Sequence, residues 1–222
     1  MTTAQHLREL LVKSLKASLG LLIFSLGVHL TVKADIGLAP WDVFAMGLSN
    51  HLPLTFGQAT MMISIIIVIV DILLKEQIGL GTILDAIIVG IGIDLFEALN
   101  FIPDSPNYFI SVIYIIIGLF IMAYSQYLYM SACISCGPRD TFLVGVGKRL
   151  KKLPIGAVSI IEAIVVLVIG WLLGGPVGPG TVLTTGCTGI TMQIVFRIFK
   201  FEPRNLVHEG ILGTVRRFKK QK

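Results

Sequence analysis

Two short stretches with the pattern Pro-x-Asp-x-Phe place an acidic residue within an otherwise apolar sequence. The first contains Asp42 and the second contains Asp140, 98 positions further on (140 − 42). Proline is tolerated in the first turn of a helix, and an acidic residue there faces the positive end of the helix dipole. Each stretch therefore predicts the start of a short helix. Its carboxylate either takes a proton, a cation or an amine, or completes the helix start by accepting backbone N–H bonds.

The residue before the acid differs between the two stretches, being Trp41 in the first and Arg139 in the second. A guanidinium near the middle of a bilayer costs at least about 2.5–3.5 kcal/mol unless it is paired or hydrated. Arg139 therefore needs Asp42, Asp140 or an anionic ligand nearby, and two helix N-termini beside it would suit a carboxylate or a phosphate. Trp41 either stacks on a ligand or packs, and Thr141 completes the predicted substrate-binding set.

Three further acidic residues, Asp85, Asp94 and Glu162, lie inside apolar segments. Acids within membrane helices are more often functional than structural, although Asp85 is close enough to a helix end to be solvated. In the second half of the chain, Thr184 and Gln193 occupy the positions equivalent to Asp85 and Asp94. We therefore predict that these five residues line a polar cavity, and that Asp94 or Glu162 couples transport to a proton or another cation.

The chain is an internal duplication. Upstream of the two acidic stretches, Gly20-Leu21 returns as Gly118-Leu119 at the same spacing of 98. Downstream, after one inserted residue, Gly81-Thr82 returns as Gly180-Thr181 at a spacing of 99. A repeat that persists in both directions has to be read before any single element. It predicts one membrane domain over residues 1–222, with repeats at about 15–99 and 108–199.

The composition is that of an integral membrane protein. Of 222 residues, 55% are hydrophobic and 14% are charged, and the mean hydropathy is +0.86. A soluble domain of this length would not tolerate such a surface. The net charge of +5 does not indicate nucleic-acid binding, because Lys and Arg gather on the cytoplasmic flank of membrane proteins. No cleavable signal peptide is expected, and the first span serves as the targeting signal.

Six apolar blocks are long enough to cross a hydrocarbon core of roughly 30 Å, which takes about 20 helical residues. Each half also contains a segment too short to cross. The predicted spans are 15–32, 56–74, 82–99, 108–130, 155–173 and 181–199, and the short helices are 37–49 and 137–147. The fold class is therefore an all-α membrane protein with six transmembrane helices and two short re-entrant half-helices.

The basic residues choose the orientation of these segments. If the short helices re-enter, Lys75, the cluster at 148–152 and the basic tail share one side, which predicts cytoplasmic termini. Crossing short helices would divide the positive clusters between both sides, and we reject that topology. Three spans per half make the two repeats inverted, so their half-helices meet near the midplane. Asp71, near the cytoplasmic end of its span, is expected at the interface.

Several motifs occur along the chain: Gly-Leu-Ala-Pro-Trp-Asp-Val-Phe from Gly37, Gly-Thr at Gly81, Ile-Asp at Ile93, Gly-Pro-Arg-Asp from Gly137 and the glycine-rich stretch from Gly170 to Thr181. Together these motifs resemble those of the YczE/YyaS/YitT-like bacterial integral membrane proteins. The resemblance covers nearly the whole chain apart from the termini, and it implies a location in the bacterial inner membrane. One departure is a more polar sixth span, at Thr184, Thr185, Cys187 and Thr188.

Cofactor and metal chemistry are not expected. Cys133 and Cys136 form a Cys-x-x-Cys without a second metal pair, and Cys187 stands alone. A nucleophile motif and a His or Cys cluster are both lacking, so we predict that the protein is not an enzyme. The tail at 201–222 reads as a basic amphipathic helix that binds anionic lipid headgroups.

The leading hypothesis is a transporter or channel-like permease for a small polar or charged solute, with its central site at the two half-helix N-termini. One alternative is a substrate-capturing membrane subunit of a multi-component transporter. Another is a membrane assembly or regulatory factor without transport activity. The sequence is also compatible with a homo-oligomer.

Overall fold

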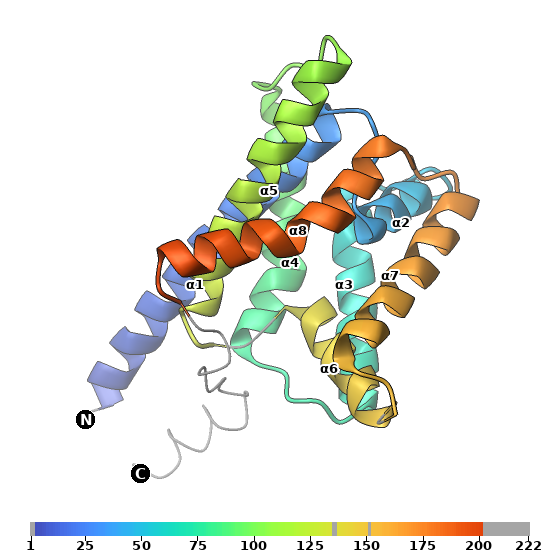
Figure 1. Ribbon diagram of the computed structural model, residues 1–222. Coiled ribbons are helices and arrows are strands. Elements are labelled where there is room, and N and C mark those ends of the chain that lie inside the picture. The colour runs from blue at the N-terminus through green and yellow to red at the C-terminus, as the bar shows by residue number, and fades with distance from the viewer. Residues whose placement is uncertain (1–2, 135–136, 151, 202–222) are drawn as a thin grey trace.

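The computed structural model describes residues 3–134, 137–150 and 152–201, and the regular secondary structure of this part of the chain is all α-helix (Figure 1). Cys136 and the predicted basic tail from residue 202 onward lie outside the described residues. The helices are α1 (Thr3–Lys33), α2 (Pro40–Ser49), α3 (Phe56–Leu73), α4 (Leu80–Leu99), α5 (Tyr108–Met130), α6 (Pro138–Arg149), α7 (Ile155–Leu172) and α8 (Pro179–Ile198).

Among the described helices, α1, α3, α5 and α7 are long and apolar enough to cross a membrane. The outer faces of these helices carry large apolar side chains: Ile160 on α7 is 63% exposed and Leu172 is 73% exposed. Contiguous exposure of this kind suits a lipid environment rather than water. The protein is therefore a multi-pass membrane protein.

The other two predicted spans correspond to α4 and α8, which are 20 residues long and thus span about 30 Å. Both carry polar or charged side chains along their length. Three acids lie on α4, namely Asp85, Asp94 and Glu97, and α8 carries Gln193 among several threonines. These side chains explain why α4 and α8 do not reach the apolarity of a typical span.

The short helices begin as their sequences require. Proline occupies the first turn of both α2 and α6, and the preceding residues, Ala39 and Gly137, have extended backbone conformations. Asp42 and Asp140 stand in the first turn of their helices. Proline fixes its own φ near the helical value and lacks the N–H that a first turn leaves unbonded. Both helices therefore start at the predicted prolines.

The helix bounds follow the sequence repeat. Helices α3 and α7 both have 18 residues and start 99 positions apart (155 − 56). Helices α4 and α8 both have 20 residues and again start 99 positions apart (179 − 80). The first helix departs from this pattern because α1 runs unbroken from Thr3, well before the predicted start of the first span at residue 15.

The two halves interlock through equivalent contacts. Helices α1 and α5 lie side by side (Figure 1), α2 packs on α7, and α3 packs on α6. The Gly81 N–H donates to the Ile134 carbonyl at 3.0 Å, and the Gly180 N–H donates to the Ile36 carbonyl at 2.7 Å. These two bonds join equivalent positions in opposite directions. The two connections are therefore reciprocal.

Candidate functional site

A cavity of about 390 Å³ lies between the starts of α2 and α6, and we call it the central cavity. Its volume is that of a small-molecule site. Its wall also includes residues of α1, α3, α4, α5, α7 and α8, so both halves of the chain line it. Several of the site residues predicted from the sequence line this cavity. They are Trp41, Asp42, Asp85, Arg139, Asp140 and Glu162.

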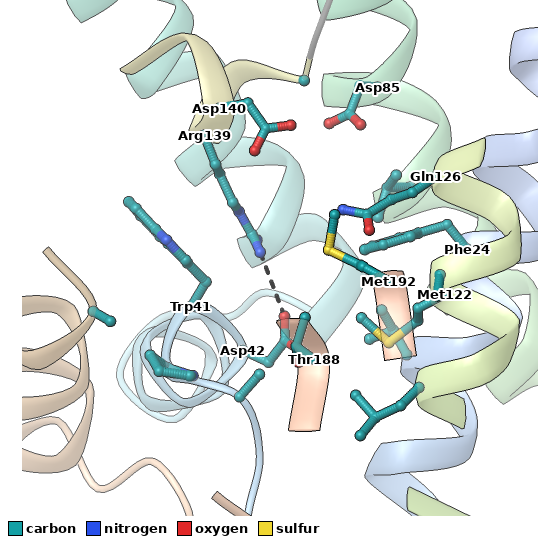
Figure 2. Close-up of a pocket in the computed structure, with 18 of the residues that line it drawn as sticks. Phe24, Trp41, Asp42, Asp85, Met122, Gln126, Arg139, Asp140, Thr188 and Met192 are labelled. Atoms are coloured by element: carbon teal, nitrogen blue, oxygen red, sulfur yellow. Dashed lines mark ion pairs between the residues drawn. The ribbon is translucent and has the colours of Figure 1, made fainter. Parts of the chain in front are cut away.

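An ion pair between Arg139 and Asp42 joins the two short helices across this cavity. The Arg139 Nη1 atom lies 3.7 Å from the Asp42 Oδ1 atom, and Asp42 is only 4% exposed. The Arg139 guanidinium also lies 5.2 Å from the centre of the Trp41 ring, within the range of a cation–π interaction. Figure 2 shows Arg139 extending from α6 toward Asp42, with Trp41 beside it. The buried carboxylate and the guanidinium thus compensate each other's charge.

Trp41 and Arg139 are equivalent positions of the two repeats. In a two-fold arrangement, a residue that touches its own counterpart lies close to the axis. The stacking of Arg139 on Trp41 therefore marks the point where the halves meet. The repeat is broken chemically at this point, because one half supplies a cation and the other supplies an aromatic ring.

Three more carboxyl groups face the same cavity. The Tyr129 hydroxyl donates to the Asp140 Oδ2 atom at 3.4 Å, and Asp85 lies beside Asp140 (Figure 2). Glu162 reaches the cavity from α7. Four carboxyl groups and the Arg139 guanidinium thus line one cavity. Carboxylates that share a site repel one another, so the cavity is suited to protons or a cationic ligand.

The structure places the other predicted site residues outside the central cavity. The Thr141 hydroxyl donates to the Gly137 carbonyl at 3.0 Å, and the Thr184 hydroxyl donates to the Thr181 carbonyl at 3.0 Å. Both bonds lie within the residues' own helices, which satisfies the hydroxyl groups locally. Gln193 is exposed on the outer face of α8.

Asp94 also points away from the central cavity and instead completes the start of α3. Its Oδ1 atom accepts the Gly57 N–H at 3.0 Å, and its Oδ2 atom accepts the Thr55 hydroxyl at 2.5 Å. The first N–H groups of a helix have no partner within the helix, so an acid from a neighbouring helix stabilises that end. Asp94 therefore binds α4 to α3.

Replacing Asp94 with alanine is expected to lower the unfolding free energy by about 1–2 kcal/mol, because the Gly57 N–H loses its acceptor. The melting midpoint of the protein in detergent should fall by roughly 2–8 °C. Gln193→Ala removes the equivalent but exposed side chain and should leave the midpoint unchanged. A normal midpoint combined with lost solute binding in Asp94→Ala would instead make Asp94 a ligand-binding residue.

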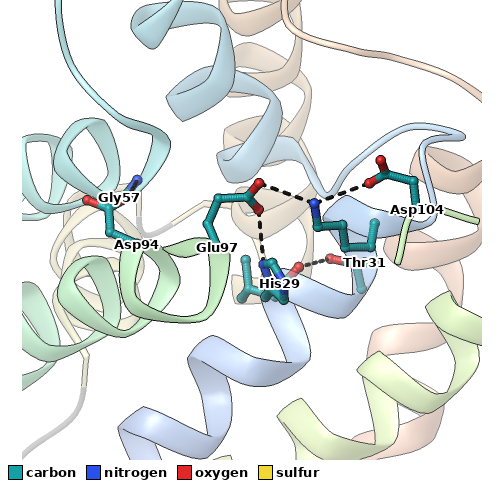
Figure 3. Close-up of polar contacts among 8 residues, drawn as sticks. His29, Thr31, Gly57, Asp94, Glu97 and Asp104 are labelled. Atoms are coloured by element: carbon teal, nitrogen blue, oxygen red, sulfur yellow. Dashed lines mark hydrogen bonds and ion pairs between the residues drawn. The ribbon is translucent and has the colours of Figure 1, made fainter. Parts of the chain in front are cut away.

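A second cavity, of about 670 Å³, lies at the end of the bundle where α1 and α4 finish. There the Lys33 ammonium lies 3.1 Å from Glu97 and 3.2 Å from Asp104, and Glu97 lies 3.4 Å from the buried His29 ring (Figure 3). Ile93 lines both the second cavity and the central cavity. Since Ile93 is only 2% exposed, it forms part of the wall between them.

Sequence reasoning missed several residues of the central cavity. Gln126 is an amide within an apolar helix, and that could have indicated it. Other missed residues of the cavity include Tyr129 on α5, Ser159 on α7, and Thr188 and Met192 on α8. Their residue types do not distinguish them from residues that only pack.

Asp71 lies near the end of α3, as the sequence predicts for a residue close to the end of a span. Its side chain is fully buried against the rest of the protein. Within the described residues neither carboxylate oxygen has a hydrogen-bond partner. Asp71 does not line the central or the second cavity.

The fold is that of a multi-pass helical membrane protein, and it contains a cavity lined by charged side chains. The chain belongs to a family of unknown function, DUF6198, whose model matches residues 12–197. Its similarity to the YczE and YyaS proteins confirms the resemblance found in the sequence motifs.

Three relatives show how far the similarity extends. The uncharacterized membrane protein YczE of Bacillus subtilis (strain 168) is 32% identical over 177 residues, or 78% of this chain and 80% of that protein. An uncharacterized protein of Haemophilus influenzae is 31% identical over 176 residues, or 79% of each chain. The uncharacterized protein YyaS of B. subtilis is 30% identical over 193 residues, or 84% of this chain and 94% of that protein. No solved structure matches.

Proposed function

We propose that the protein is a permease that carries a small, positively charged solute across the bacterial inner membrane through the central cavity. The observation that carries this proposal is the Asp42–Arg139 pair, formed by the starts of two short helices in a cavity that both halves of the chain line. Interrupted helices that place polar groups inside a membrane protein are characteristic of transporters. Irregular backbone at that depth is tolerated only next to protein or a water-filled cavity.

The proposed topology has six spans, formed by α1, α3, α4, α5, α7 and α8, with α2 and α6 as re-entrant half-helices. Three spans per half invert the second repeat, and the reciprocal bonds at Gly81 and Gly180 support a two-fold relation. Basic residues gather at the junction of α3 and α6, where Lys148 lies 2.5 Å from Glu76 and Arg149 lies 3.6 Å from the same carboxylate. By the positive-inside rule this junction and both termini are cytoplasmic.

The charge of the solute follows from the groups in the cavity. Asp42 already compensates Arg139, so an anionic solute would have to displace a buried carboxylate from the guanidinium. A cation instead meets Asp85, Asp140 and Glu162, and it adds charge compensation that the cavity otherwise lacks. This reasoning favours an amine or an inorganic cation over the carboxylate or phosphate that the helix N-termini alone would suit.

The proposal is tested by binding and flux measurements with defined probes. Ammonium, methylammonium, putrescine, Na⁺ and K⁺, each as the chloride, are compared with acetate and phosphate in thermal-shift assays. The cation that binds is then followed into proteoliposomes. We expect one or more cations to raise the melting midpoint and Glu162→Gln to weaken that cation's binding at least tenfold.

The matched control is Glu9→Gln, which neutralises a surface acid paired with Lys13 and should leave binding unchanged. Stabilisation by acetate or phosphate alone would contradict the proposed charge preference. Unaltered cation binding in Glu162→Gln would remove the central cavity as the site.

A further inference from the structure

The two repeats differ in how their last two helices pack. Gly57 on α3 and Gly90 on α4 bring these helices into close contact: a Cβ atom on Gly90 would lie 2.5 Å from the Gly57 carbonyl oxygen. The equivalent residues 99 positions later are Gly156 on α7 and Gly189 on α8. A Cβ atom on either of these would meet no heavy atom within 4 Å. The repeat thus has the same glycines in both halves, but only one pair is in contact.

The difference extends along the helices. Helix α3 packs against α4, whereas no comparable packing joins α7 and α8 in the described chain. Figure 1 shows α7 and α8 diverging from the turn that connects them. Small residues in membrane helices permit close approach of backbones. Gly156 and Gly189 would likewise permit close approach, but no described helix lies against either of them.

The ends of the helices differ in the same way. Asp94 supplies an acceptor to the Gly57 N–H at the start of α3. Gln193 occupies the equivalent position on α8, where it is exposed, and the start of α7 has no side-chain cap. An exposed amide on a membrane helix is unfavourable unless another arrangement gives it a partner. Closure of α8 on α7 would bring Gln193 toward the Gly156 N–H, as Asp94 meets Gly57.

The gap between α7 and α8 adjoins the central cavity. On α7, Ser159 and Ala163 follow Gly156 on the same helical face and line the cavity. On α8, Thr185 and Met192 flank Gly189 and line it as well. On the opposite side, the packed α3–α4 pair and Ile93 separate the central cavity from the second cavity. The cavity is therefore closed by the first repeat and bordered by an open helix pair in the second.

We propose that the two repeats exchange these arrangements. In a second conformation α7 and α8 close through Gly156 and Gly189, while α3 and α4 separate at Gly57 and Gly90. This exchange opens the central cavity to the opposite side of the membrane, which is alternating access built from inverted repeats. The role of this exchange in transport rests on the proposed function. Whether the exchange occurs can be tested separately from transport.

Cross-linking of paired cysteines tests the exchange in the full-length chain in membranes. In a background with the native cysteines replaced by serine, Gly156→Cys/Gly189→Cys should form a disulfide within one chain under mild oxidation. A disulfide requires Cα atoms within about 7 Å, which open helices do not provide. We expect oxidation to stop transport and a reductant to restore it.

Each single cysteine variant is the control, and each should remain monomeric under the same oxidation. Adding Gln193→Ala to the double variant should lower the yield of the cross-link severalfold. A cross-link without measurable solute transport would support the exchange and count against the permease. Transport with no cross-link, or cross-linked dimers from the single variants, would overturn the exchange. Cross-linked dimers would mean that the helix face carrying Gly156 or Gly189 packs against a second copy of the chain.

Discussion

Replacing Arg139 with glutamine is expected to lower the unfolding free energy by about 3 kcal/mol and to tighten cation binding severalfold, because the freed Asp42 carboxylate adds a negative charge to the cavity. The loss of stability arises because Asp42, which is 4% exposed, would keep a buried charge without its partner. Removing one member of a buried ion pair costs about 3–5 kcal/mol. The lower end applies because 27% of the Arg139 side chain is exposed and the pair is 3.7 Å apart. Thermal unfolding in detergent and cation binding measure the two effects.

The double variant Asp42→Asn/Arg139→Gln tests whether both effects arise from the freed carboxylate. It removes one charge of each sign, so most of the lost stability should return, and cation binding should return close to that of the unaltered protein because Asp85, Asp140 and Glu162 remain in the cavity. Arg149→Gln is the matched control, since Arg149 lies at the surface junction of α6 and α3 with 48% of its side chain exposed. Equal stability losses in Arg139→Gln and the double variant would show that the pair is not coupled.

The fold was largely predictable because the signals lie within single segments. Apolar length and proline at a helix start each act locally, and the bounds of α3, α5 and α7 follow the predicted spans closely. The 98- to 99-residue repeat adds a comparison between the two halves. The start of α1 was not predictable from these signals. Its first turns are polar, and helical continuity there has no marker comparable to a proline or a glycine.

The candidate site was predictable where the repeat and the helix start both pointed to one residue, as for Asp42 and Asp140. On α4 the sequence assigned Asp85 and Asp94 to one cavity, whereas the structure places them in different surroundings. Asp85 and Asp94 are nine residues apart, which is two and a half turns of an α-helix, so they face opposite sides. Asp85 accordingly lines the central cavity and Asp94 binds the start of α3. Helical periodicity would have shown that the two acids cannot share one cavity.

The asymmetry between the repeats could not be read from the sequence. Gly57 and Gly156 are the same residue type at equivalent positions, as are Gly90 and Gly189. A sequence that permits close packing in both halves does not say which half is packed. That choice depends on the relative positions of whole helices, which only the structure shows.

A leucine at Gly90 and a leucine at Gly189 should therefore have opposite consequences. Gly90→Leu places a side chain against the Gly57 carbonyl and against Met61, whose Cβ would lie 2.9 Å from the new Cβ. Overpacking of this kind costs about 1–3 kcal/mol, and it should lower the melting midpoint by several degrees.

Gly189→Leu meets open space, so its unfolding free energy should stay within about 0.5 kcal/mol of that of the unaltered protein. Its transport should nevertheless stop, because the leucine prevents α8 from closing on α7. Melting midpoints in detergent and cation flux into proteoliposomes decide between these outcomes. If both leucines destabilise the protein equally, then α7 and α8 are packed as tightly as α3 and α4. If Gly189→Leu transports normally, closure at that glycine is not part of the cycle. The pair works as a test because the repeat supplies the same substitution in a packed and an open setting.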